Sequence, residues 1–118
     1  RCGFCGLGCR HNAKQSPLLT YLPRALVAGA VLHADARVTH IEQRERDGGQ
    51  GTPPLKRVHA LIDGRQYGRA PRALTIDAPI VVVAGGAIET PVLLQRSGLG
   101  GGGVGDWLRL HPTTAVAG

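Results

Sequence analysis

The sequence predicts an α/β fold: a helix, a strand and an antiparallel β-meander, then a buried parallel strand, a glycine turn and a second helix. The first observation is an unbroken β-branched run at 80–83, typical of a parallel strand buried on both faces. The second is the run of small residues at 84–87 that follows it. The third is the alternation of apolar and polar residues within 56–62, which indicates a half-buried strand.

The chain begins with a loop and a helix. Residues 1–16 are rich in glycine and cysteine and are predicted to be a loop. The helix that follows has two candidate starts, at Ser16-Pro17 or at Thr20 with Pro23. Gly29 is expected to lie near its end.

Extended segments are predicted at 31–33 and 37–44. A loop without apolar residues, 47–54, separates them from the alternating strand. Asp63-Gly64 is a tight-turn dipeptide, and it leads into a further extended stretch at 65–69. These segments together predict three consecutive antiparallel strands.

The β-branched run, the small residues and the next helix form one unit. At the turn, the backbone can approach a ligand closely because no large side chain stands in the way. Thr90 and Pro91 then supply an N-cap acceptor and a pre-set φ at the first helical position. Because ligands of open α/β sheets bind beyond the carboxyl ends of the strands, this unit predicts a nucleotide site.

The high positive charge, taken alone, suggests a nucleic-acid partner. The 118 residues carry a net charge of +6, and the sequence pI is about 10.1. However, the basic residues are spread along the chain, and it holds only one Trp, two Tyr and one Phe to stack on bases. We therefore expect a solvated, arginine-rich surface and no nucleic-acid partner.

The run from Ala84 to Gly100 resembles a signature of the glucose-methanol-choline (GMC) oxidoreductases, flavoproteins that oxidise alcohols. The family pattern is roughly Ala-Gly-Ala-Ile-x-Ser/Thr-Pro-x-Leu-Leu-x-x-Ser-Gly-Ile/Leu-Gly, and Gly86 stands where the family often has Ala. The resemblance implies the cofactor FAD and a fragment of a Rossmann-like FAD-binding domain. All of 1–118 would belong to that domain. Its parts would be the loop, the helix with the meander at 17–78, and the strand, signature helix and following segment at 79–118.

The resemblance also implies cofactor-binding residues. In the family, a Val on the strand before the meander meets the adenine of FAD through its backbone, and the similar segment 36–41 assigns this contact to Val38. Gly85, Gly86 and Ala87 are implied to pass near the ribose and pyrophosphate of the cofactor. From the residues alone, Val38 is a core strand residue and the turn is a packing device.

Three thiols within eight residues make the initial loop a second candidate site: Cys2, Cys5 and Cys9. Three thiols are one short of a closed tetrahedral site, and either His11 would be the fourth ligand or a three-cysteine cluster would keep an open corner. The spacing also fits a Cys2–Cys5 or Cys5–Cys9 disulfide, or three buried reduced thiols, and no second Cys or His pair downstream favours a metal. The alternative function is a metal or iron-sulfur electron-transfer module built on these cysteines.

Two further segments match the family. Residues 9–23 resemble the Cys-rich segment of its long-chain (fatty) alcohol oxidase branch, and 104–112 resembles the segment after the signature, with Trp107 at the usual Asn position. His111 is the residue type for general acid-base chemistry, but with no partner group in the sequence it is more typical of a structural histidine. The resemblance places the catalytic His in a carboxy-terminal region that this chain does not contain, so no catalytic residue is expected in this fragment and His111 is the only remaining candidate.

The other histidines show no partner in the sequence. His33, His40 and His59 lie on predicted strand faces without an acidic or cysteine neighbour that would suggest chemistry. We expect them to be surface residues.

The function that the resemblance implies is FAD-dependent oxidation of an alcohol, with hydride passing from the alcohol carbon to the flavin. The acceptor of the electrons, oxygen or a redox partner, stays open. The chain begins at Arg1 and holds no Met, whereas GMC enzymes are several times longer. We therefore expect an internal fragment that supplies part of the FAD scaffold, works with the rest of the parent enzyme chain and is inactive alone.

Overall fold

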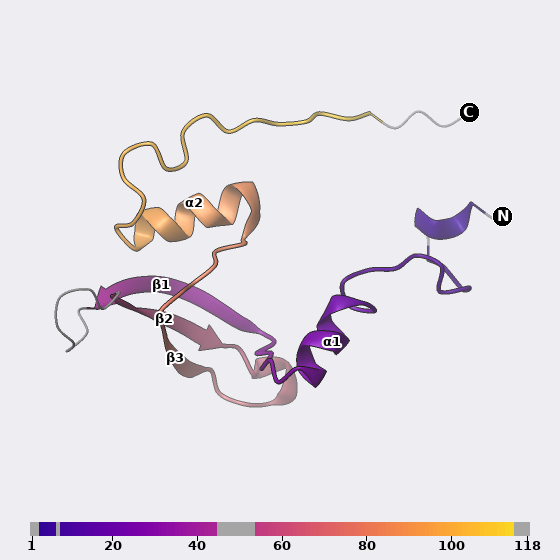
Figure 1. Cartoon of the computed structure of the whole chain (residues 1–118), viewed down its shortest axis with the longest axis horizontal. Coiled ribbons are helices and arrows are strands. Elements are labelled where there is room, and N and C mark those ends of the chain that lie inside the picture. Colours follow the sequence, from indigo (N-terminus) through magenta and orange to yellow (C-terminus); the bar gives the residue numbers. More distant parts are fainter. Residues whose placement is uncertain (1–2, 7, 45–53, 115–118) are drawn as a thin grey trace. The chain divides into compact units, whose positions relative to one another are not determined.

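The chain divides into two compact units, Arg1–Ala34 and Asp35–Gly118. The computed structural model describes residues 3–6, 8–44 and 54–114 (Figure 1). Within these residues, no helix has the length and apolar character needed to cross a membrane. Cys2 and most of the 47–54 loop lie outside the described residues.

The first unit holds a short 3-10 turn, η1 (Phe4–Gly6), and one helix, α1 (Tyr21–Val27). The predicted end of this helix is confirmed, because Gly29 adopts a φ of +92° and the amide of Ala30 bonds back to the Ala25 carbonyl at 2.9 Å. Residues 31–33, predicted to be an extended segment, belong to no strand.

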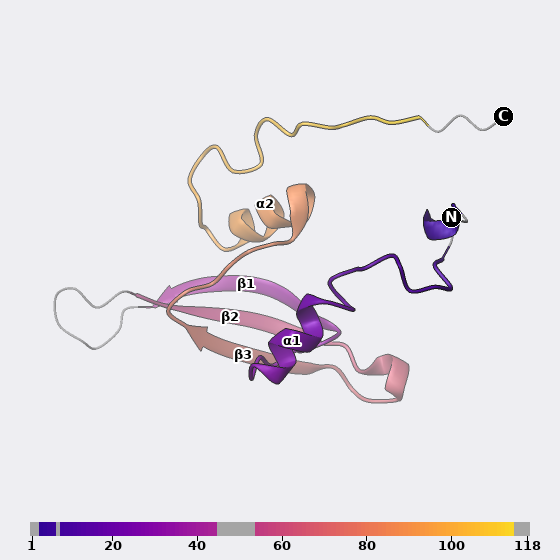
Figure 2. The same ribbon diagram turned by 45° about the vertical axis from the view of Figure 1, so that its right-hand side comes forward.

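The second unit is a three-stranded antiparallel sheet with one helix beside it. The strands are β1 (Ala36–Arg44), β2 (Leu55–Ile62) and β3 (Arg72–Ala78), in the spatial order β1-β2-β3. Figures 1 and 2 both show α2 (Gly86–Arg96) lying along β1. The amide of Ile41 on β1 donates to the Ser97 hydroxyl just after α2, at 2.9 Å. Ile41, 3% exposed, is the most buried residue of the core.

The third strand begins later than the sequence predicts. Residues 65–69 form a 3-10 turn, η2 (Arg65–Tyr67), which ends at Gly68 with a left-handed φ of +68°. Asp63 causes this, because its carboxylate accepts from the Arg65 amide at 3.1 Å and from the Arg65 guanidinium at 2.6 Å. These bonds wrap the chain locally, so the strand resumes only at Arg72.

Asp63 makes this turn sensitive to acid. Its pKa is lowered to about 2 from 3.8, first by the Arg65 side chain and then by the Arg65 amide. Because the folded pKa is depressed, the stabilisation is complete above pH 3.8 and is lost as the pH falls toward about 2. We expect Asp63→Asn to flatten the dependence of unfolding free energy on pH in this window, measured by urea denaturation. Equal slopes for both proteins would show that the exposed pair contributes nothing.

The buried parallel strand is the largest correction to the predicted fold. Residues 80–83 have no regular secondary structure and pair with no strand in the described part of the chain. Ile80 and Val82 are 79% and 84% exposed. The β-branched run is suited to a covered parallel strand, but such a strand needs a neighbouring parallel strand, and the described residues supply none.

Helix α2 also begins earlier than predicted. Gly85 is its N-cap residue and Gly86 its first residue, whereas Thr90 and Pro91 lie inside it. The predicted start at Thr90 is therefore wrong. Consequently the glycine turn is itself the helix N-terminus, where the first backbone amides have no partner within the helix.

Candidate functional site

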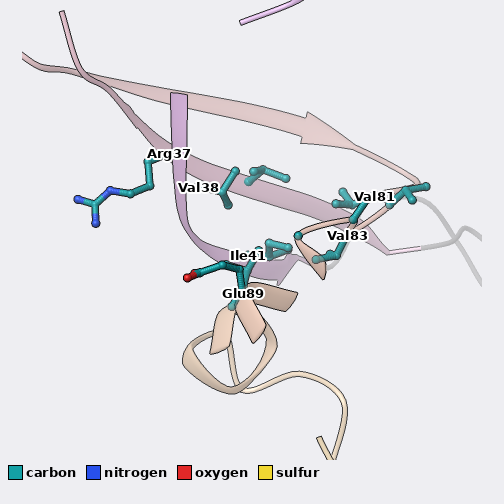
Figure 3. A pocket seen from close by; sticks show the side chains of 11 residues that line it. Arg37, Val38, Ile41, Val81, Val83 and Glu89 are labelled. Carbon is teal, nitrogen blue, oxygen red and sulfur yellow. The ribbon is translucent and has the colours of Figure 1, made fainter. Parts of the chain in front are cut away.

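The candidate site is a pocket of about 310 Å³ in the second unit. Figure 3 shows its side chains converging from β1, the 81–83 segment and α2. The lining residues are Arg37, Val38, Ile41, Val58, Val81, Val82, Val83, Ala84, Gly85, Glu89 and Leu93. Apolar walls with few polar groups are typical of small-molecule and cofactor sites.

A β-bulge in β1 shapes this pocket. Val38 pairs with Ala60 and His40 pairs with His59, so Thr39 is an extra residue with no partner on β2. In a regular strand, Val38 and Ile41 would face opposite sides of the sheet. Because of the bulge, both line the pocket. The Thr39 hydroxyl donates to the His59 carbonyl at 3.2 Å, which ties the bulge to β2.

The pocket brings together two residues that the sequence analysis assigned separately. Val38 and Gly85 are far apart in sequence and both line it. Gly86 and Ala87 continue directly from Gly85 as the first residues of α2. Gly86 has a φ of +79°, and nothing lies within 4 Å of the position its Cβ would take, so the backbone of this turn is accessible.

The pocket carries two charged side chains. Arg37 projects from β1 and Glu89 from the first turn of α2, and both are exposed (Figure 3). The other lining residues are apolar or are glycine. Such a surface can bind a flat ring against its apolar walls and polar groups at its rim, but it offers no general base of the histidine or lysine type.

The cysteine loop does not assemble into a cluster in the described residues. Cys5 is exposed, Cys9 is half-buried, and both are free thiols, so of the alternatives the structure does not support a Cys5–Cys9 disulfide. No third metal-ligating side chain among the described residues joins them, and Cys2 lies outside that range. The pKa of Cys9 is lowered chiefly by backbone amides, first that of Lys14 and then that of Ala13.

His111 is exposed in the irregular segment after α2 and does not line the pocket. Near it, Trp107 adopts a φ of +61°, and the Arg109 guanidinium carbon lies 6.0 Å from the centre of its ring. The structure therefore gives His111 no partner that would make it a base within the described residues.

Two other histidines are not the isolated surface residues that the sequence suggests. The rings of His40 and His59 stack with centroids 4.1 Å apart and planes 7° from parallel. Each Nε2 lies 3.3 Å from Oε1 of Glu42, and the pKa of Glu42 is lowered first by His59 and then by His40. The spacing of His40 and Glu42 could have signalled a shared face, because residues i and i+2 of a strand project alike.

The known proteins that this chain is similar to are GMC-type oxidoreductases and long-chain-alcohol oxidases. A family described as GMC oxidoreductase matches residues 1–113. A GMC-type oxidoreductase of Mycobacterium tuberculosis is 43% identical over 123 residues, which cover 99% of this chain and 17% of the relative. The long-chain-alcohol oxidase FAO3 of Arabidopsis thaliana is 32% identical over 111 residues, which cover 94% of this chain and 15% of the relative.

A further GMC-type oxidoreductase, from Sinorhizobium fredii, is 36% identical over 124 residues, which cover 96% of this chain and 20% of the relative. The chain thus spans a fifth or less of the length of these relatives. No solved structure gives a significant match.

Proposed function

Because the chain belongs to the GMC oxidoreductase family, we propose that it forms part of the FAD-binding scaffold of an enzyme that oxidises alcohols at the CH–OH group. One observation carries this proposal: Val38 and Gly85, which the family pattern implicates separately, line a single pocket. The relatives named long-chain-alcohol oxidases favour a long-chain alcohol as substrate.

The pocket fits a part of FAD. Its valine walls suit the planar adenine, and Val38 would meet the ring through its backbone amide and carbonyl. The N-terminus of α2 offers unpaired amides for the pyrophosphate, beside the open backbone of Gly86 and Ala87. Arg37 would suit phosphate oxygens, whereas the Glu89 carboxylate would accept from a ribose hydroxyl.

The proposed role of the described residues is to bind the cofactor, not to carry out the chemistry. FAD, when bound, supplies the acceptor for the hydride of alcohol oxidation. The described residues would hold and orient the cofactor and exclude water from its adenine half with Val38, Val58 and Ile41. The catalytic histidine, the alcohol site and the site that meets oxygen or a redox partner are proposed to lie in other parts of the parent enzyme.

The test is the visible spectrum of the protein expressed from its complete reading frame. We expect a flavin spectrum that bleaches under anaerobic conditions when a long-chain primary alcohol is added, and bleaches more slowly with ethanol. A folded protein without flavin would contradict the FAD proposal. Flavin that is reduced equally fast by both alcohols would contradict the substrate class alone.

A further inference from the structure

The polar face of the sheet carries a second cluster that the proposed cofactor pocket does not use. His59 follows the pocket residue Val58 on β2, and Glu42 follows Ile41 on β1. Because side chains alternate along a strand, His59 and Glu42 project from the opposite face. His40 pairs directly with His59 across the two strands, so all three side chains share that face.

The three side chains have the spacing of a metal centre. Their ligand atoms lie within 4.8 Å of one another, and each imidazole Nε2 is 3.3 Å from Glu42 Oε1. Tetrahedral Zn²⁺ with bonds of about 2.0–2.1 Å separates its ligand atoms by about 3.3–3.4 Å. The distances from the carboxylate oxygen to both nitrogens therefore match two edges of such a site.

The Thr39 hydroxyl orients the His40 ring. The single hydroxyl proton of Thr39 is donated to the His59 carbonyl, at 3.2 Å. At its other contact, 3.3 Å from His40 Nδ1, the hydroxyl oxygen is free to accept, so the contact suits an Nδ1 that carries a hydrogen. The other ring nitrogen, Nε2, faces the Glu42 carboxylate at 3.3 Å, so a cation bound between these two atoms would be shared by both.

The neighbouring groups favour a metal cation there. His59 Nε2 is buried and makes no properly oriented hydrogen bond within the described residues, although Glu42 is close. Arg57, which pairs with Glu42 in the register, makes two 2.6 Å hydrogen bonds to Asp77. The Arg57 charge is balanced chiefly by Asp77, and Glu42 is the carboxylate that lies against the two rings.

We propose that His40, Glu42 and His59 form a Zn²⁺ site on this face, with the fourth position open. Two imidazole nitrogens and one carboxylate oxygen are a donor set that suits Zn²⁺, and three protein ligands leave room for water or another ligand. The rings must rotate out of their parallel stack on binding, since lone pairs in two parallel planes do not meet at one point. Thr39 acts as a positioning residue that orients His40.

The test is Zn²⁺ binding by the complete protein, measured by competition with a chromogenic chelator. We expect Glu42→Gln, which keeps the shape of the side chain, and His59→Gln each to weaken binding at least about tenfold. His33→Gln is the matched control and should bind as the wild type does. Thr39→Val should weaken binding by about tenfold, because it removes the hydroxyl that orients the His40 ring.

A second readout separates ligation from a structural role. Zn²⁺ should raise the Tm of the wild type and of His33→Gln, but raise it far less in Glu42→Gln, with all metal-free proteins folded by circular dichroism. Equal Zn²⁺ affinity of the wild type and the Glu42→Gln and His59→Gln variants would overturn the proposal. So would a wild type whose Tm does not respond to Zn²⁺. If His59→Gln fails to fold, the Zn²⁺ affinities of Thr39→Val and Glu42→Gln test the proposal in its place.

Discussion

Deletion of Thr39 is expected to abolish FAD binding, whereas Thr39→Val should leave it intact. The deletion removes the extra residue of the bulge, so the strand on one side of it must turn its side chains to the other face. Val38 and Ile41 can then no longer both line the pocket. Since Ile41 is 3% exposed and anchors the core, we expect Val38 to leave the pocket.

The deletion must turn either Ile41 or Val38 to the other face of the sheet, and the free-energy cost of each change decides which one moves. Removing Ile41 from the core would cost about 2–4 kcal/mol, by analogy with large-to-small substitutions, so the sheet keeps it inside. Turning Val38 to the other face keeps Ile41 buried, but it displaces the Val38 backbone amide and carbonyl that we propose bind adenine. The valine substitution keeps the residue count and loses the hydroxyl contacts with the His59 carbonyl and with His40 Nδ1, about 1 kcal/mol each, so the bulge and its register remain.

The measurement is the flavin content of the purified complete proteins, together with their affinity for added FAD. We expect a stoichiometric cofactor in the wild type and in Thr39→Val, and less than about a tenth of that occupancy in the deletion variant, a loss of about 1.4 kcal/mol or more. If the deletion variant is folded and fully occupied, the bulge does not shape the cofactor site. Thr39→Val thus separates the two proposed sites, because it should lose Zn²⁺ affinity and keep FAD.

The sequence predicts those elements that depend on local chemistry. The end of α1 at Gly29 and the two strands on either side of the 47–54 loop are confirmed, because a left-handed glycine and alternating side chains act within a few residues. The predictions that fail depend on partners elsewhere. Residues 80–83 have the composition of a buried strand, yet the composition cannot say whether a neighbouring strand is present.

In the candidate site, too, the features set by local sequence are predictable and those set by strand pairing are not. The glycine turn is recognisable from its residues, and so is Val38 once the family pattern is seen. The bulge at Thr39 is not, because it is defined by register against β2 and no residue in β1 marks it. The cluster on the other face is predictable only in part. Alternation along β1 predicts that His40 and Glu42 share a face, but the pairing of His59 with His40 depends on the shifted register.

Replacement of Gly86 by valine is expected to reduce FAD affinity roughly tenfold to hundredfold. Its φ of +79° is a conformation that costs a non-glycine residue about 1–3 kcal/mol, and a β-branched residue is among the least tolerant. The space around the Cβ position is open, so the penalty arises from the backbone and not from a clash. Gly103→Val is the matched control, since Gly103 is equally open but has no left-handed φ.

The chain also has a conformation into which Gly86→Val can relax. Thr90 and Pro91 are the helix-start signal that the sequence analysis identified and that the native structure passes over. Strain at residue 86 would move the start of α2 to Thr90, and the free amides beside Gly85 would be lost from the pocket. FAD titration of the complete protein should therefore show weaker binding, with slightly less helix by circular dichroism. Unchanged FAD affinity in Gly86→Val would mean that the cofactor does not depend on this turn, because a shift of the helix start removes those amides even if the protein stays folded.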